Sequence, residues 1–191
     1  RQALAAYLGL WLSRNAMRMT TVGRWNQGGE KVETPFDGQA IPMKWDYPEA
    51  NPFSDVTGGF ANQLDRIVQF LLREASPNGI KGDGALVYRG DGTRLYVSDG
   101  AVETGVTDPP YVDAIAYADL SDFFYVWLKR GLAEAIPEAF GTPLTPKADE
   151  ATALKHRHAG DAERARLHFT SKLAACLAEA RRACRSDGVV S

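Results

Sequence analysis

The sequence predicts an α/β fold, with a mixed and mostly parallel sheet flanked by helices. Segments with apolar side chains at helical spacing alternate with short runs of β-branched residues. One such run, residues 102–107, meets the Pro109-Pro110 pair, which cannot continue a β ladder. The last helical segment leads into Val189-Val190, which is typical of a following strand. Strands separated by helices in this order favour crossover connections and a parallel sheet.

Length and composition fit an ordinary globular domain. The chain has 191 residues, of which 45% are hydrophobic and 24% charged. Its net charge of −2 gives no overall basic surface, so a nucleic-acid enzyme of this sequence would need a local basic groove. No apolar run approaches the ~20 residues that span a bilayer, and no secretory signal is recognisable. We therefore expect a cytoplasmic protein without a membrane partner.

Cysteine and histidine spacing argues against a disulfide or a metal site. Cys176 and Cys184 lie in one helical pattern, roughly 12 Å apart along its axis, which is too far for a disulfide. The histidines are His156, His158 and His168. No cysteine or carboxylate spacing complements the His-x-His pair, and Lys155 and Arg157 would repel a cation. We predict reduced thiols, a solvated histidine loop and no metal.

Residues 1–78 are predicted to form an N-terminal helical and irregular segment that packs on a core of residues 79–191. A first helix follows from an apolar stripe at three- and four-residue spacing, and a second starts near Gly59 and extends through Leu72. Between them, residues 28–59 contain several prolines and are predicted to be irregular. Their aromatic anchors are Phe36, Trp45, Tyr47 and Phe53. A stretch of that length is usually a functional or docking loop.

Arg14, Arg18 and Arg24 form a basic cluster with Trp25 after the first helix. They could contact nucleic acid, or extend over the edge of the core.

The predicted core begins with a short strand over residues 79–83 and a possible strand over residues 94–97. A strand over residues 102–107 and an apolar helix from about residue 120 to Gly131 follow. A long helix over residues 162–184, stopped by Gly188, precedes the final strand.

The loop Thr107-Asp108-Pro109-Pro110-Tyr111 carries the candidate catalytic residues Asp108, Pro109, Pro110 and Tyr111. Each proline removes a backbone donor, and Pro110 favours extended geometry at Pro109. Backbone carbonyl groups that have no strand partner are then expected beside the Asp108 carboxylate and the Tyr111 ring. These groups suit an amino group attached to a flat base, although Asp-Pro-Pro also occurs in ordinary turns.

The exocyclic amino group of adenine is a poor nucleophile, because its lone pair is delocalised into the ring. A carboxylate and a carbonyl that accept its two N–H bonds favour a pyramidal nitrogen and stabilise the positive charge that builds on it. An aromatic ring can stack on the flipped base for roughly 1–3 kcal/mol.

Asp83 is a candidate for the same crevice. Like Asp108, it follows a predicted strand, and ligands gather at the carboxyl ends of parallel strands. A turn role within Lys81-Gly82-Asp83-Gly84 is an equal alternative.

The Asp-Pro-Pro-Tyr loop and its continuation from Ala114 to Leu128 resemble the core of large bacterial adenine-specific DNA methylases that carry an N-terminal domain of unknown function. Further similar segments are Arg24-Trp25, Glu30 to Val32, Gln39 to Met43, Trp45 to Ser54 and Leu144 to Lys147. The resemblance implies a Rossmann-like methyltransferase fold, S-adenosyl-L-methionine as methyl donor and adenine in DNA as acceptor. It also implies restriction-modification or phage defence as a setting, with possible further subunits.

The glycine-rich donor loop of that family is not found. Gly28-Gly29 and Gly58-Gly59 lack its strand-then-helix setting. We therefore expect an internal fragment of a longer methylase with a partial fold, in which Asp83 is the candidate at the donor's adenine and donor binding is weak. The alternatives are an amino-group methylase acting on RNA or protein, and a non-catalytic docking or DNA-recognition module.

Overall fold

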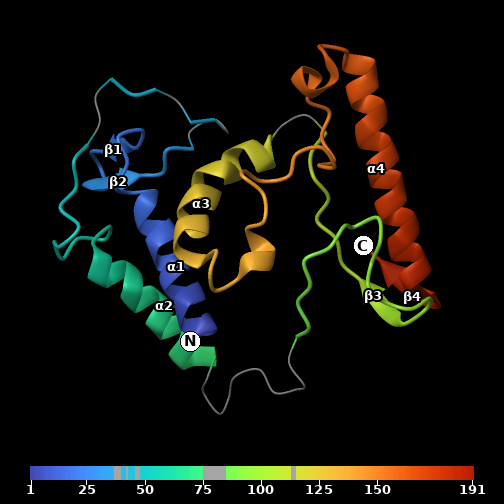
Figure 1. The fold of residues 1–191 in the computed structure, drawn as a ribbon, viewed down its shortest axis with the longest axis horizontal. Helices are drawn as coiled ribbons and strands as arrows, with labels where there is room; N and C mark the ends of the chain where they lie inside the picture. The colour runs from blue at the N-terminus through green and yellow to red at the C-terminus, as the bar shows by residue number, and fades with distance from the viewer. Residues whose placement is uncertain (37–39, 42, 46–47, 75–84, 113–114) are drawn as a thin grey trace. The chain divides into compact units, whose positions relative to one another are not determined.

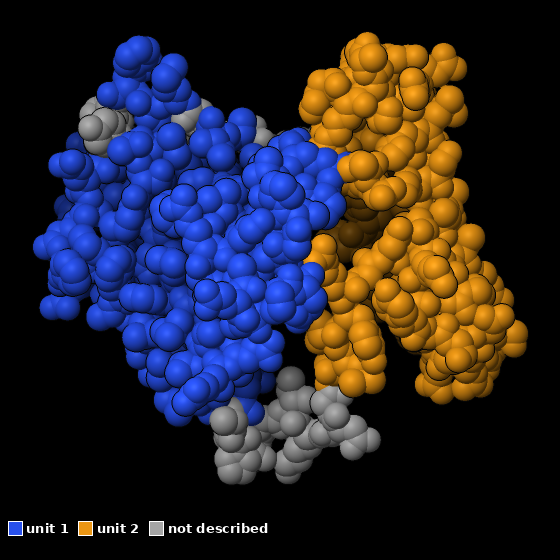
Figure 2. Space-filling view, in the orientation of Figure 1, with its two compact units in different colours: residues 1–84, 117–147 blue, residues 85–116, 148–191 orange. Residues whose placement is uncertain are grey.

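The computed structural model describes residues 1–191 except 37–39, 42, 46–47, 75–84 and 113–114 (Figure 1). The chain forms two compact units (Figure 2). Unit 1 comprises Arg1–Gly84 and Tyr117–Lys147, and unit 2 comprises Ala85–Ala116 and Ala148–Ser191. The predicted boundary between residues 78 and 79 lies outside the described residues. The fold is mixed α/β, with small sheets, one of them parallel, and flanking helices.

The described residues of unit 1 form three α-helices and one hairpin. The helices are α1 (Gln2–Ala16), α2 (Phe60–Glu74) and α3 (Tyr117–Leu132), and the antiparallel hairpin consists of β1 (Arg24–Asn26) and β2 (Lys31–Glu33). A short 3₁₀ turn, η2 (Pro137–Ala139), follows α3. The three predicted helices of this region are confirmed.

Small and aromatic side chains decide how α1 packs. A Cβ at Gly9 would lie 2.8 Å from Leu132 Cδ1, so glycine permits the close approach of α1 and α3. The Trp11 ring packs edge-on against Phe60 at 5.2 Å, and its Nε1 donates to the Phe60 carbonyl at 3.0 Å. Glycine and tryptophan therefore fix α1 between α2 and α3.

The basic residues Arg14, Arg18 and Arg24, at and beyond the end of α1, bind groups of unit 1 itself. Arg14 Nε donates to Gln63 Oε1 at 2.8 Å, and Arg18 Nη1 donates to the Val32 carbonyl at 2.6 Å. Arg24 pairs with Glu33 in the hairpin. These contacts favour the core-edge interpretation over nucleic-acid contact.

Residues 28–59 are only partly irregular, because β2 lies within them. The Phe36 ring lies 5.6 Å from Phe123 and 5.3 Å from Phe124, and so anchors the segment to α3. Phe53 contacts the Phe60 ring at 5.7 Å but is 83% exposed. Trp45 is 90% exposed and is not an anchor. Among the four predicted anchors, only Phe36 is therefore packed against a helix of the described core, and Tyr47 lies outside the described residues.

Unit 2 contains a parallel pair of strands joined through a long helix. The strands are β3 (Val102–Gly105) and β4 (Cys184–Val190), and α4 (Ala162–Ala183) lies between them in the chain. The short 3₁₀ turn η3 (Lys155–His158) precedes α4. Asp161 caps α4, because its side chain accepts from the amides of Glu163 and Arg164. The predicted strand 102–107, long helix and final strand are therefore present.

The end of α4 differs from the prediction, because Gly188 does not stop the helix. The helix ends at Ala183, and Cys184 adopts extended geometry and pairs with Val102. Gly188 lies inside β4, where the register shifts and a Cβ would come within 2.7 Å of the Glu103 carbonyl oxygen. The glycine is needed for a close strand approach rather than for a helix stop.

The possible strand over residues 94–97 is not formed. Only an isolated bridge joins Asp91 and Arg94 there. Side chains of α4 satisfy the backbone instead: Leu95 N donates to Glu179 Oε1 at 2.8 Å, and Arg182 Nη2 donates to the Val97 carbonyl at 2.9 Å. The predicted strand over residues 79–83 lies outside the described residues. Within the part of the chain that is described, no helix has the length and apolar character to span a bilayer.

Candidate functional site

The Asp-Pro-Pro-Tyr loop follows directly on the carboxyl end of β3. Strand pairing continues just beyond the strand, because Ser191 N donates to the Gly105 carbonyl at 2.9 Å and Thr107 N donates to the Ser191 carbonyl at 2.8 Å. Asp108 is the first residue after this paired backbone. Neither Pro109 nor Pro110 has an amide hydrogen with which to extend the ladder. The chain therefore leaves the sheet at Asp108.

The side chains of this loop are open to a ligand. Asp108 and Pro109 are exposed, and Pro110 is half-buried. The Tyr111 side chain is 65% exposed. Among the residues that the structure describes, the Asp108 carboxylate and the Tyr111 hydroxyl have no hydrogen-bond or ion-pair partner. A carboxylate without a protein partner at a strand end can bind a ligand's N–H groups.

A backbone hydrogen bond fixes the chain just after the loop. The Ala153 amide donates to the Val112 carbonyl at 2.7 Å, which ties the residue after Tyr111 to the segment that leads into η3. Asp83, the predicted partner of Asp108, lies outside the described residues. The structure therefore places four of the five predicted site residues in one loop and says nothing of the fifth.

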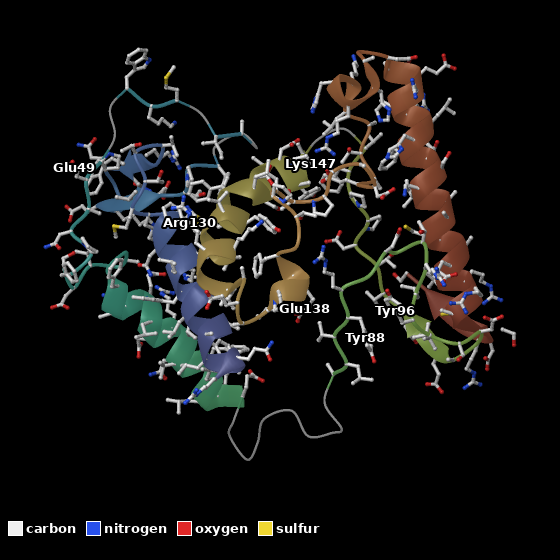
Figure 3. All side chains as sticks on the ribbon, viewed as in Figure 1. Glu49, Tyr88, Tyr96, Arg130, Glu138 and Lys147 are labelled. Atoms are coloured by element: carbon white, nitrogen blue, oxygen red, sulfur yellow. The ribbon has the colours of Figure 1, made fainter. Side chains whose placement is uncertain are left out.

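A second cluster, in unit 1, joins two of the motifs that carry the family resemblance. Lys147, which is labelled in Figure 3, belongs to this cluster. Its Nζ lies 2.7 Å from Asp122 Oδ2, in the second turn of α3. Thr145 N donates to Asp122 Oδ1 at 2.9 Å, and Thr145 Oγ1 lies 2.6 Å from the Ala118 carbonyl oxygen. The Leu144 to Lys147 segment is thereby attached to the first two turns of α3.

The environment of Asp122 lowers its pKa. Partial burial raises the pKa, but the hydrogen bonds from Lys147 and Thr145 outweigh burial, so the carboxyl group has a pKa below its usual value. Asp122 is therefore a saturated, ionised acid with a structural role. Nothing in the spacing of the two motifs along the sequence indicates that they are in contact.

A groove on α4 is the other site that sequence analysis missed. Its volume is ≈ 630 Å³, and its polar lining consists of Thr93, His158, Arg164, His168, Ser171 and Lys172. Arg164, His168 and Lys172 follow one another at four-residue spacing in α4, so they share one face. This four-residue spacing is the feature of the sequence that indicates a basic face on the helix.

The histidines of the groove are not in a solvated loop. The rings of His158 and His168 lie 5.1 Å apart, and His168 Nε2 lies 3.0 Å from the Glu150 carbonyl oxygen. His156 alone is exposed. No group of three histidine, cysteine or acidic residues with the arrangement of a metal site occurs in the described ranges.

Comparison with protein-family models, with curated proteins and with solved structures finds no match for this chain. The resemblance to adenine-specific methylases therefore depends on the sequence motifs alone. Any functional assignment depends on these motifs and on the loop at the end of β3.

Proposed function

We propose that this chain is part of an S-adenosyl-L-methionine-dependent methyltransferase that acts on the exocyclic amino group of adenine in DNA. One observation carries the proposal. The Asp-Pro-Pro-Tyr loop follows the carboxyl end of a parallel strand, where α/β proteins bind ligands, and its carboxylate is exposed and has no partner in the described structure.

Each residue of the loop has a role in this proposal. Asp108 accepts one N–H bond of the amino group, and the backbone carbonyl of Pro109 accepts the other. Pro110 holds Pro109 extended, so that its carbonyl projects toward the base. Tyr111 provides a ring on which the flipped base stacks. Two acceptors on one amino group leave its lone pair directed away from both, toward the methyl group to be transferred.

The methyl donor supplies a methyl group bound to a positively charged sulfur. The described residues suit the adenine side of such a reaction better than the donor side. Gly28-Gly29 lies in the turn between two strands, and Gly58-Gly59 precedes α2 without a strand before it. Neither therefore has the setting of a donor loop. Asp83 is the proposed contact to the donor's adenine.

The same loop could grip the amino group of an RNA base or of a glutamine side chain. The family resemblance favours DNA. The deciding experiment offers radiolabelled donor to the protein that contains this chain, with duplex DNA, RNA of the same sequence or a glutamine peptide as acceptor. Label in N6-methyladenine of DNA supports the proposal. Label only in RNA or peptide, or in no acceptor, would overturn it.

A further inference from the structure

The groove on α4 has the chemistry of a phosphate-binding site. Its polar lining presents one guanidinium, one ammonium, two imidazoles and two hydroxyl groups. No carboxylate is among the described residues that line it. Groups of this kind donate hydrogen bonds to phosphate oxygens, and arginine does so with two parallel N–H groups.

The charges around the groove leave Arg164 available. Lys172 Nζ binds Asp149 Oδ1 at 2.8 Å, but Asp149 is 81% exposed, so this is a surface ion pair that contributes little. Asp91 accepts from the amide and hydroxyl of Thr93 at 2.9 and 2.8 Å. The exposed Arg164 guanidinium has no ion-pair partner in the part of the chain that is described.

Glu150, which lies behind His168, is paired with Arg157, and both side chains are 15% exposed. Glu150 and Asp149 are therefore paired with cations, whereas Asp91 remains a carboxylate that is bonded to Thr93. Lys155, in the η3 turn next to the groove but not in its lining, is exposed and has no ion-pair partner among the described residues.

The groove lies at the same end of unit 2 as Asp108. Gly100 N, just before β3, donates to the Arg182 carbonyl near the end of α4 at 2.9 Å. Val112, beyond β3, is bonded to Ala153, in the segment that precedes η3 and α4. These two contacts indicate that α4 runs opposite to β3, so that the chain leaving the Asp108 loop meets the segment that leads into α4. Residues from Arg164 to Lys172 belong to the first half of α4.

We propose that this groove binds the phosphodiester backbone of the DNA whose adenine enters the Asp108 loop. Arg164 is the principal phosphate contact, and Lys172, Ser171 and His158 are supporting donors, because the His168 Nε2–H already donates to the Glu150 carbonyl. The inference rests on the proposed function and supplies the local basic site that the net charge of −2 makes necessary.

The test measures binding of a fluorescent DNA duplex to the 191-residue chain over a range of salt concentrations, without methyl donor. Arg164→Gln is compared with Arg166→Gln, a matched control that removes the same charge from an exposed site on α4 outside the groove. We expect Arg164→Gln to weaken binding and to reduce the slope of log K against log[salt] by about 0.9, as for one lost phosphate contact. The control should change the slope by less than half as much.

Equal effects of the two variants, or an unchanged slope for Arg164→Gln, would overturn the groove proposal. A second arm titrates inorganic phosphate alone and follows the ring-proton NMR signals of His158 and His168. Shifts there, combined with unaltered DNA binding by Arg164→Gln, would assign the groove to a small anion and reject the DNA backbone.

The DNA-binding assay contains no donor, so it does not depend on methyl transfer. If Arg164→Gln binds DNA like the control variant while the protein still methylates adenine in DNA, only the groove proposal is rejected. DNA binding through Arg164 without methylation of any acceptor rejects the proposed function.

Discussion

Asp108 and Asp122 are separated by one short stretch of chain but have opposite environments. Asp108 is exposed and has no partner among the described residues. Asp122 binds Thr145 and Lys147, and its side chain is 21% exposed. An acid whose hydrogen-bonding capacity is filled by the protein stabilises the fold, whereas one left open can bind a ligand. The comparison therefore separates an aspartate with structural bonds, Asp122, from the proposed catalytic aspartate, Asp108.

The largest expected effect is the loss of activity when Asp108 is replaced. Asp108→Ala should lower methyl transfer by at least ~10²-fold, the scale for losing one preorganised electrostatic group. The melting temperature should stay unchanged, because the Asp108 side chain makes no hydrogen bond or ion pair with the residues that the structure describes. Steady-state kinetics and thermal melts check both. Asp65→Ala, at an exposed site on α2, is the control. Near-normal activity of Asp108→Ala would remove it from the mechanism.

Asp122, whose hydrogen bonds are made within the protein, should affect stability rather than activity. Asp122→Ala removes the carboxylate that accepts from Lys147 Nζ and from the Thr145 amide, whereas Lys147 Nζ retains the Thr145 carbonyl as an acceptor. A hydrogen bond to a charged group contributes roughly 1.5–3 kcal/mol, so we expect the free energy of unfolding to fall by roughly 1–3 kcal/mol in urea titrations. Activity per folded molecule should persist. A stable but inactive Asp122→Ala protein would instead give this acid a direct role in the reaction.

Tyr111 tests whether the open loop stacks on a base. Tyr111→Ala should cost roughly 1–3 kcal/mol of binding to DNA that carries a mismatched, easily flipped adenine. Tyr111→Phe retains the ring and should bind almost as well as the wild type. Equal losses in the two variants would show that the hydroxyl group, rather than the ring, makes the contact.

The smallest expected effect concerns Glu179, another carboxylate whose hydrogen bonds are made within the protein. Hydrogen bonds from Arg182 and from the Leu95 amide lower the pKa of Glu179 to about 2. A carboxyl group with a lowered folded-state pKa stabilises the protein above its unfolded-state value, and this contribution is lost as the pH falls from about 4.5 toward 2. Glu179→Gln should therefore lower the melting temperature at pH 7 and make the melting temperature less sensitive to pH between 5 and 2. An identical acid dependence in the variant would contradict the assignment.

Periodicity alone was enough for the helices, because an apolar stripe at helical spacing must be buried whatever it packs against. It also placed the strand before Asp108 and the strand after α4. The predictions of a strand over residues 94–97 and of a helix stop at Gly188 were wrong, because both segments depend on partners distant in the chain. The backbone of residues 95–97 bonds to Glu179 and Arg182, and Gly188 meets Glu103 across the strand pair.

The sequence by itself determined that Asp108 follows a strand, since two prolines end any ladder. It also determined the order of the helices α1 to α4 and of the strands β3 and β4, but it did not predict the hairpin of β1 and β2. Only the tertiary structure decided that β3 and β4 are parallel neighbours, that Asp122 is saturated by Thr145 and Lys147, and that Thr93 and His158 meet the basic face of α4. Local propensity is encoded over a few residues, whereas these contacts join segments far apart in the chain, and no spacing rule specifies their partners.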